Sequence, residues 1–243
     1  MSIHDRRRST LYRAERFGVP EIPQINDKRV SALYAEFDSL WRDWNHALDA
    51  SETINVDTTL PDDLKKVRVK RVADSKVKAV DERVTSAIAA AETEIADIER
   101  TFESHLQPTS AASEMRRATL RQSLLNLPDG KRLDVVRDAI QNNDVALLDA
   151  VASGRPYESG TIALHFAEAR EKLFEHQQPA DFRALGLLKS GVKQLTNAAL
   201  SFVDAVRDDL APKDAEEIAE RARKADAAAN AGITNGGGNN VAQ

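Results

Sequence analysis

Ser190 and Lys193 stand three residues apart in the segment SGVK, which formally matches the Ser-x-x-Lys arrangement in which a lysine assists a serine nucleophile. The further motifs that this chemistry requires do not occur in the sequence. Two glycine-containing stretches, GRPYESGT and GLLKSGVK, have the general form of a phosphate-binding loop. Both lack its Gly-Lys-Ser/Thr ending, and neither follows a predicted strand. We therefore expect no catalytic residues of either kind.

The five histidines are dispersed along the chain, and none has a glutamate three residues before it, as helical di-iron sites require. The chain has no cysteine, so thiolate catalysis, zinc–thiolate sites and disulfides are excluded. Neighbouring carboxylates such as Asp208 and Asp209 lie beside basic residues on amphipathic segments and are interpreted as solvated faces. The sequence thus predicts no metal site and no cofactor, and it indicates that the protein is not an enzyme.

The composition favours long helices over sheets. Of the 243 residues, 42% are hydrophobic and 30% are charged, but only 5% are aromatic. The net charge of −5 argues against nucleic-acid binding by the chain as a whole. No uncharged apolar run approaches the roughly 18 residues that a membrane-spanning helix needs, and the N-terminus has no apolar signal region. We expect a soluble protein that does not bind membranes.

One uninterrupted segment predicts an unusually long helix. From Asp62 to Gln107 neither glycine nor proline occurs, so a helix of about 45 residues and about 65–70 Å is expected. Between residues 75 and 102 the apolar residues recur at steps of three or four, which defines a narrow apolar seam. Its candidate interface residues are Val77, Val84, Ile88, Ile95, Ile98 and Phe102. Such length indicates a coiled coil or a helical hairpin.

A second seam lies in a helix predicted at 179–212. Its candidate interface residues are Leu188, Val192, Leu195 and Phe202. Two seams of similar period can cover each other within one chain, or each can pair with another copy, and the sequence leaves both arrangements open. A further amphipathic helix, predicted at 27–49, carries Trp41 and Trp44 as core or interface anchors.

The first long helix has a polarised charge. Seven residues form a basic patch in its first half: Lys65, Lys66, Arg68, Lys70, Arg71, Lys76 and Lys78. Acidic residues dominate its second half, so an antiparallel copy would place unlike charges side by side. The basic patch is also the best candidate for nucleic-acid contact. Its residues spread around the helix without interleaved aromatics, so an acidic partner within or between chains is favoured.

The middle of the chain contains shorter elements. Helices are predicted at 114–127, 130–141, 144–153 and 161–176. Helices of this length are marginal alone and must pack together. The predicted organisation is a basic flexible arm at 1–25, a long-helix region at 26–107, a globular short-helix region at 108–178, a second long helix at 179–212, and an alanine-rich helix with a disordered tail at 213–243. The fold class is all-α, with coiled-coil-like long helices or helical hairpins, a small globular helical centre and flexible termini.

The stretch LLNLPDGKRLDVVRDAIQNNDVALLDAVASGRPYESG resembles a pattern found in uncharacterised helical proteins of tailed phages and prophages. In that pattern a short helix, an Asn/Asp turn, a helix like DVALLDAV, a proline and a Ser-Gly precede a longer helix. The corresponding features here are Asn143, residues 144–151, Pro156 and Ser159–Gly160. The YES segment between Pro156 and Gly160 is more polar than its counterpart in the pattern. The resemblance covers about 70 residues and implies a place in a virion or in its assembly, without catalytic residues.

These observations predict a non-enzymatic structural or assembly protein of a phage virion that acts through helix–helix contacts. Its expected partners are other copies of itself and other virion or assembly proteins. Its expected location is the virion, or the host cytoplasm during assembly. The alternative is a cytosolic helical adaptor or regulator that binds nucleic acid weakly and without sequence preference through its basic segments.

Overall fold

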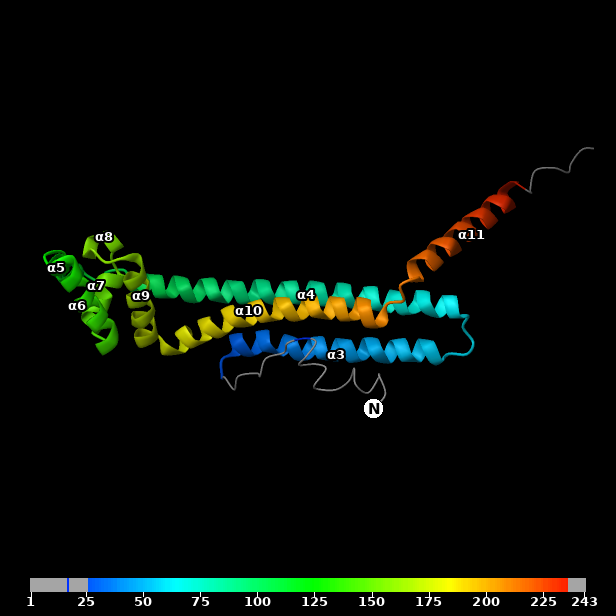
Figure 1. The fold of residues 1–243 in the computed structure, drawn as a ribbon, viewed down its shortest axis with the longest axis horizontal. Helices are drawn as coiled ribbons and strands as arrows, with labels where there is room; N and C mark the ends of the chain where they lie inside the picture. The colour runs from blue at the N-terminus through cyan, green and yellow to red at the C-terminus, as the bar shows by residue number, and fades with distance from the viewer. Residues whose placement is uncertain (1–16, 18–25, 236–243) are drawn as a thin grey trace, which may run out of the picture. The chain divides into compact units, whose positions relative to one another are not determined.

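The computed structural model describes Phe17 and residues 26–235, and within them every regular element is a helix (Figure 1). The all-α prediction is therefore confirmed. Apart from Phe17, the predicted basic arm at 1–25 lies outside the described residues, as do positions 236–243 of the predicted tail. None of the described helices combines the length and the apolar character needed to cross a membrane.

The chain forms two compact units, each assembled from segments that are distant in sequence. Unit 1 consists of Ser31–Ile88 and the described residues from Val192 onward, together with Phe17. Unit 2 consists of Asn26–Val30 and Ala89–Gly191. The regions predicted from the sequence begin and end at helix ends. The two compact units instead each contain part of the same three long helices, so the boundaries of the units fall inside helices.

Helix α3 spans Lys28–Val56, seven residues beyond the end predicted for it at Asp49. The prediction of a break at this point is wrong because residues 50–56 contain no glycine or proline, and Ser51 is buried on the inner face. The helix ends where the Asp57 carboxylate accepts a hydrogen bond from the Thr59 backbone N–H at 2.8 Å. The helix is therefore terminated by a turn that the Asp57 side chain forms with the backbone, and not by a glycine.

The long helix predicted from the absence of glycine and proline is present. Helix α4 spans Asp62–His105, directly after Pro61, and has Asp62 and Asp63 in its first turn. These carboxylates favour a helix start because they lie at the positive end of the helix dipole. The apolar stripe on α4 is the seam predicted from its sequence period.

The second long helix, α10, spans Pro179–Ala205 and continues into a π-helical turn, η1, at Val206–Leu210. The wider turn is visible in its hydrogen bonding, since the Ala211 N–H donates to the Val206 carbonyl at 2.9 Å, five residues back. Pro212 then ends the regular structure, and α11 follows at Ala215–Asn235.

Unit 1 is built on three helices, α3, α4 and α10, which lie side by side (Figure 1). Its core is aromatic where α3 meets α10. The Trp44 ring is completely buried and lies edge-on to the Phe202 ring at 6.5 Å. Phe17 packs against both rings and against Trp41, so this residue of the predicted arm belongs to the core. Trp44 is thus a core anchor, as predicted, whereas Trp41 is only partly buried and contacts Phe17 at the edge of this core.

The short helices of unit 2 are α5 at Ala111–Leu125, α6 at Asp129–Asn142, α7 at Val145–Ala152, α8 at Pro156–Ser159 and α9 at Ala163–Gln177. The four predicted short helices are all present, and the single turn of α8 lies where the sequence indicated only a connection. Helix α7 is central because it packs against α5, α6 and α9. Its residues Leu148, Ala150, Val151 and Ala152 are buried.

Local side chains fix the ends of these short helices. Ser110 caps α5 by accepting a hydrogen bond from the Ser113 N–H at 3.1 Å, and Asp144 caps α7 through the Leu147 N–H at 3.2 Å. Gly160 ends α8 in the left-handed region, with φ of 64°. A Cβ at this position would lie 2.3 Å from Nη1 of Arg132, so both the backbone angle and the space require glycine.

Gly186, by contrast, is exposed in the middle of α10 and has no conformational need for glycine. A Cβ built at this position meets no atom within 4 Å. We expect Gly186→Ala to raise the free energy of unfolding by about 0.5–1 kcal/mol, because alanine loses less backbone entropy in a helix. Urea unfolding followed by circular dichroism measures this, and an unchanged or lower midpoint would contradict it. Gly160→Ala is the matched control and should be destabilising.

Candidate functional site

The seams of α4 and α10 meet within unit 1. Of the predicted interface residues in this unit, Val84, Leu195 and Phe202 are buried, whereas Val77, Ile88 and Val192 are only partly covered. The sequence left open whether the seams pair within one chain or with another copy. The structure shows that they contact each other inside one chain. Their partial exposure shows that this contact does not cover them completely.

The uncovered part is a shallow groove between α4 and α10, of about 160 Å³. It is lined by Val80, Asp81, Val84, Thr85 and Ile88 from α4, and by Thr196, Ala199, Leu200 and Val203 from α10. Leu200 stands at its edge with 61% of its surface exposed. Leu200 extends the apolar strip of the groove onto the exposed surface of α10.

Three charged residues lie around this groove without an ion pair among the described residues. Asp81 lines the groove from α4, while Lys193 and Asp204 are exposed on α10, one turn before Thr196 and one turn after Leu200. They differ from most charged residues of α4, which have partners within the chain. The groove is thus an apolar strip with flanking charges of both signs that are available to another molecule.

The predicted interface residues of unit 2 also differ in how deeply they are buried. Ile98, Phe102 and Leu188 are buried, and Ile95 is partly covered. Phe102 stacks on Phe174, with ring centroids 4.4 Å apart. This stack lines an open pocket of about 480 Å³ together with Phe182 and Leu185.

Two ion pairs lie at the rim of this phenylalanine pocket. Arg170 forms an ion pair with Glu103 and lies over the Phe102 ring, 5.8 Å from its centroid. Lys189 binds Glu99 at 2.7 Å. The pocket is lined by three cationic and three anionic side chains in all, so its rim favours a ligand of neither sign.

Acidic partners within the chain account for most of the basic patch. Lys65 pairs with Asp62, Lys66 with Asp214, Lys70 with Asp74 and Glu216, Lys76 with Asp43, and Lys78 more distantly with Glu82. The carboxylate of Asp214 raises the pKa of Lys66, and that of Asp74 raises the pKa of Lys70. Arg68 and Arg71 are exposed and form no ion pair with a described residue. An intrachain acidic partner is therefore present for five of the seven residues.

Asp43 of α3 links α3 to α4. One carboxylate oxygen accepts from Lys76 Nζ at 3.1 Å and the other from Arg83 Nη1 at 2.6 Å, while Arg83 Nε donates to Glu36 at 2.7 Å. Burial by itself raises the pKa of Asp43, but the hydrogen bonds from Arg83 and Lys76 outweigh it and lower that pKa below its ordinary value.

Because the pKa of Asp43 is lowered in the folded protein, the free energy of unfolding should decrease as the pH falls into the acid range. A carboxyl with a lower pKa in the folded state stabilises the fold above its unfolded pKa of about 3.9, and this contribution is lost as the pH falls through the folded pKa. We expect the urea midpoint of the wild type to fall from about pH 5 toward pH 2–3 more steeply than that of Asp43→Asn. Asp74→Asn, at an exposed pair, is the control and should leave the slope nearly unchanged. Equal slopes in Asp43→Asn and wild type would refute the assignment.

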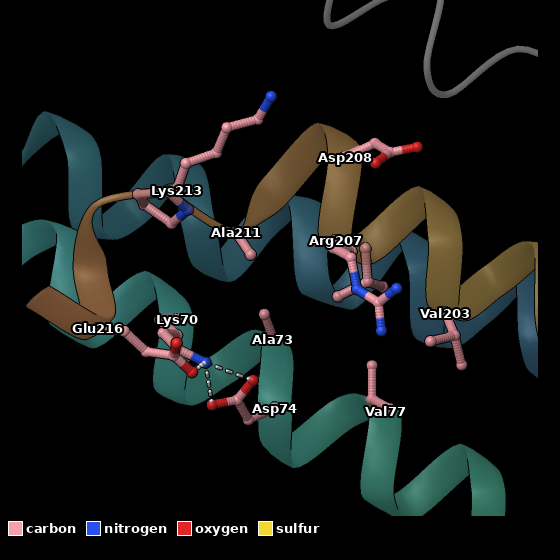
Figure 2. A pocket seen from close by; sticks show the side chains of 12 residues that line it. Lys70, Ala73, Asp74, Val77, Val203, Arg207, Asp208, Ala211, Lys213 and Glu216 are labelled. Carbon is pink, nitrogen blue, oxygen red and sulfur yellow. Dashed lines mark hydrogen bonds and ion pairs between the residues drawn. The ribbon is translucent and has the colours of Figure 1, made fainter.

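A larger pocket of about 500 Å³ lies where α4 meets η1 and the start of α11 (Figure 2). The Arg207 guanidinium points into it, whereas the Lys213 and Asp208 side chains point away. Lys70 is held between Asp74 and Glu216. Three cationic and three anionic side chains line this pocket. Their balance favours neither an anion nor a cation, so the pocket does not define a ligand.

Three arginines that sequence reasoning did not single out organise unit 2. Arg117 donates to both oxygens of Asp149 at 2.8 Å and to the Leu106 carbonyl at 2.7 Å. Arg121 reaches Glu114 and the Ala150 carbonyl. Arg132 donates to the carbonyls of Leu124, Leu127 and Gly160. Arg117 and Arg121 are buried on α5, and Arg132 is partly buried on α6. A search for apolar residues at helical spacing does not detect such arginines.

No group of three or more histidine, aspartate or glutamate side chains in the described part of the chain could hold a metal ion. His165 Nδ1 lies 2.9 Å from Glu168 Oε2, a one-turn contact on α9. Leu200 is one of several exposed large apolar residues that sequence reasoning did not single out. It lies between the predicted interface residues Leu195 and Phe202 in the sequence, and its position beside the groove distinguishes it from the others.

Comparison of the chain with protein-family models, with curated proteins and with solved structures finds no match in any of the three. The chain is therefore not assigned to a family.

Proposed function

We propose that the protein is a non-enzymatic structural or assembly component of a phage particle, and that it acts through helix–helix contacts between chains. The observation that carries this proposal is the partly open groove between α4 and α10, with Leu200 exposed at its edge. Most of the predicted seam residues are buried inside the chain, and the strip at this groove is the part of the two seams that remains open in unit 1.

Two further observations support the proposal. The segment that forms α6, α7 and α8 resembles a pattern in helical proteins of tailed phages and prophages. The charges of α4 that pair within the chain stabilise long helices without forming a cleft suited to catalysis. Long helices of this kind present extended faces, which suits assembly with other helices.

The test is peptide mass spectrometry on gradient-purified particles from the source, beside the unfractionated lysate. We expect reproducible, stoichiometric enrichment of the chain in the particles. Its presence in the lysate and absence from particles and assembly intermediates would overturn a role in the virion or in its assembly.

The second candidate is a cytosolic helical adaptor or regulator that contacts nucleic acid. Arg68 and Arg71 favour it, because they are exposed on one helix and form no ion pair with a described residue. Two phosphate contacts of this kind would give weak binding that falls about tenfold between 50 and 200 mM salt. A mobility shift of a labelled duplex at low salt that is lost in Arg68→Ala/Arg71→Ala would favour this candidate. No shift at low salt would remove it.

A further inference from the structure

The outward face of α10 carries a charge pattern that is complementary to itself. Lys193, Leu200 and Asp204 share this face, since at about 100° per residue Lys193 and Asp204 lie about 20° and 40° from Leu200 around the helix axis. All three are exposed. The opposite face of the helix bears buried Leu195 and Phe202, so this stripe is free of the core of unit 1.

We infer that a second copy of this chain packs on this face, with the two α10 helices antiparallel about a twofold axis between positions 198 and 199. This inference rests on the proposed function, because it names the partner of the α4–α10 groove. In a twofold interface, if residue i contacts j, then j contacts i. Lys193 and Asp204 are equally far from the axis, so each lysine faces the aspartate of the other copy.

The same register brings the apolar residues together. The two Leu200 positions lie three residues apart across the axis, which is about 4.5 Å at 1.5 Å per residue. Each Leu200 thereby contacts the other and covers the groove lined by Val84, Ile88 and Ala199. A parallel arrangement in register would instead oppose lysine to lysine and aspartate to aspartate, which is unfavourable.

Charge reversal in the full-length chain tests both the partner and the register. Sedimentation velocity over a concentration series at low ionic strength should show a wild-type dimer. Lys193→Asp and Asp204→Lys should each weaken the dimer at least tenfold in Kd, because two attractive pairs become two repulsive ones. An equimolar mixture of these two variants should form a heterodimer within about threefold of the wild-type Kd, since unlike charges then face each other at both pairs.

Leu200→Asp should abolish the dimer, and Arg137→Asp, at an exposed pair in unit 2, should leave the Kd unchanged. Circular dichroism melts establish that each variant is folded. A wild type that stays monomeric, single reversals that dimerise normally, or a mixture that fails to associate would each overturn the inference. Enrichment of the chain in particles is measured separately, so a failed dimer with enriched particles would refute the inference and leave the proposed function standing.

Discussion

Replacing Phe202 with alanine should lower the free energy of unfolding by about 3–5 kcal/mol. The Phe202 ring is completely buried on α10 and contacts both Trp44 of α3 and Phe17. Its removal deletes a large apolar surface and leaves a cavity at the junction of three segments, where rigid rings can relax little. The loss is large compared with the 5–15 kcal/mol stability typical of a domain.

Tryptophan fluorescence measures this effect in unit 1, since Trp41 and Trp44 are the only tryptophans of the chain and both lie in α3. The urea midpoint should shift strongly downward in Phe202→Ala with little change in slope. Leu200→Ala, two residues away on the exposed face, is the matched control. At a protein concentration at which the chain is monomeric it should change the free energy of unfolding by less than about 1 kcal/mol. Similar shifts in both variants would show that α10 does not bury one face and expose the other.

Replacing Arg117 with alanine should destabilise unit 2 by about 3 kcal/mol, the lower end of the range for breaking a buried ion pair. The Arg117 side chain is only 8% exposed, and it neutralises Asp149 while also binding the Leu106 carbonyl. Its loss leaves one carboxylate and one carbonyl without their donors. Because the Asp149 side chain is 24% exposed, water recovers part of that cost.

Hydrogen exchange at the backbone amides of α5 and α7 reports this loss, since Arg117 lies on α5 and Asp149 on α7. Protection should fall by about two orders of magnitude, in line with about 1.4 kcal/mol for each tenfold change. Arg137→Ala, at an exposed pair with Asp134, should leave protection within a few-fold of wild type. The double variant Arg117→Met/Asp149→Leu should recover most of the loss, because apolar residues can replace a buried pair. Equal protection in wild type and Arg117→Ala would refute the role of this pair.

Helix content and most helix boundaries follow from local sequence. The segment that forms α4 contains neither glycine nor proline and begins after Pro61 with two aspartates, so its start and its length depend on residues within the helix itself. The caps Ser110 and Asp144 also act through backbone groups only three residues away. Where a prediction failed, at the end of α3, the terminating signal was the Asp57 side chain and not a glycine or proline.

The apolar period likewise identified which face of each long helix is buried, because burial repeats with the turn of the helix. It could not identify the partner of that face. The seams of α4 and α10 have similar periods, and only the tertiary structure shows that they meet each other in unit 1 and share α3 as a third helix. An apolar seam indicates that this face of the helix is buried, but any other helix with a seam of similar period could pack against it.

The sequence by itself determined the all-helical character of the described residues, the long helices and the period of their seams, because these depend on backbone propensity and on spacing along one helix. Tertiary structure alone decided that Arg117 and Asp149, far apart in the chain, form one buried pair, and that Phe17 joins the tryptophans of α3. It also decided that Leu200 lies outside the core while Phe202 lies inside. Which side of a helix remains exposed depends on how many neighbours surround it, and that number is a property of the packed structure.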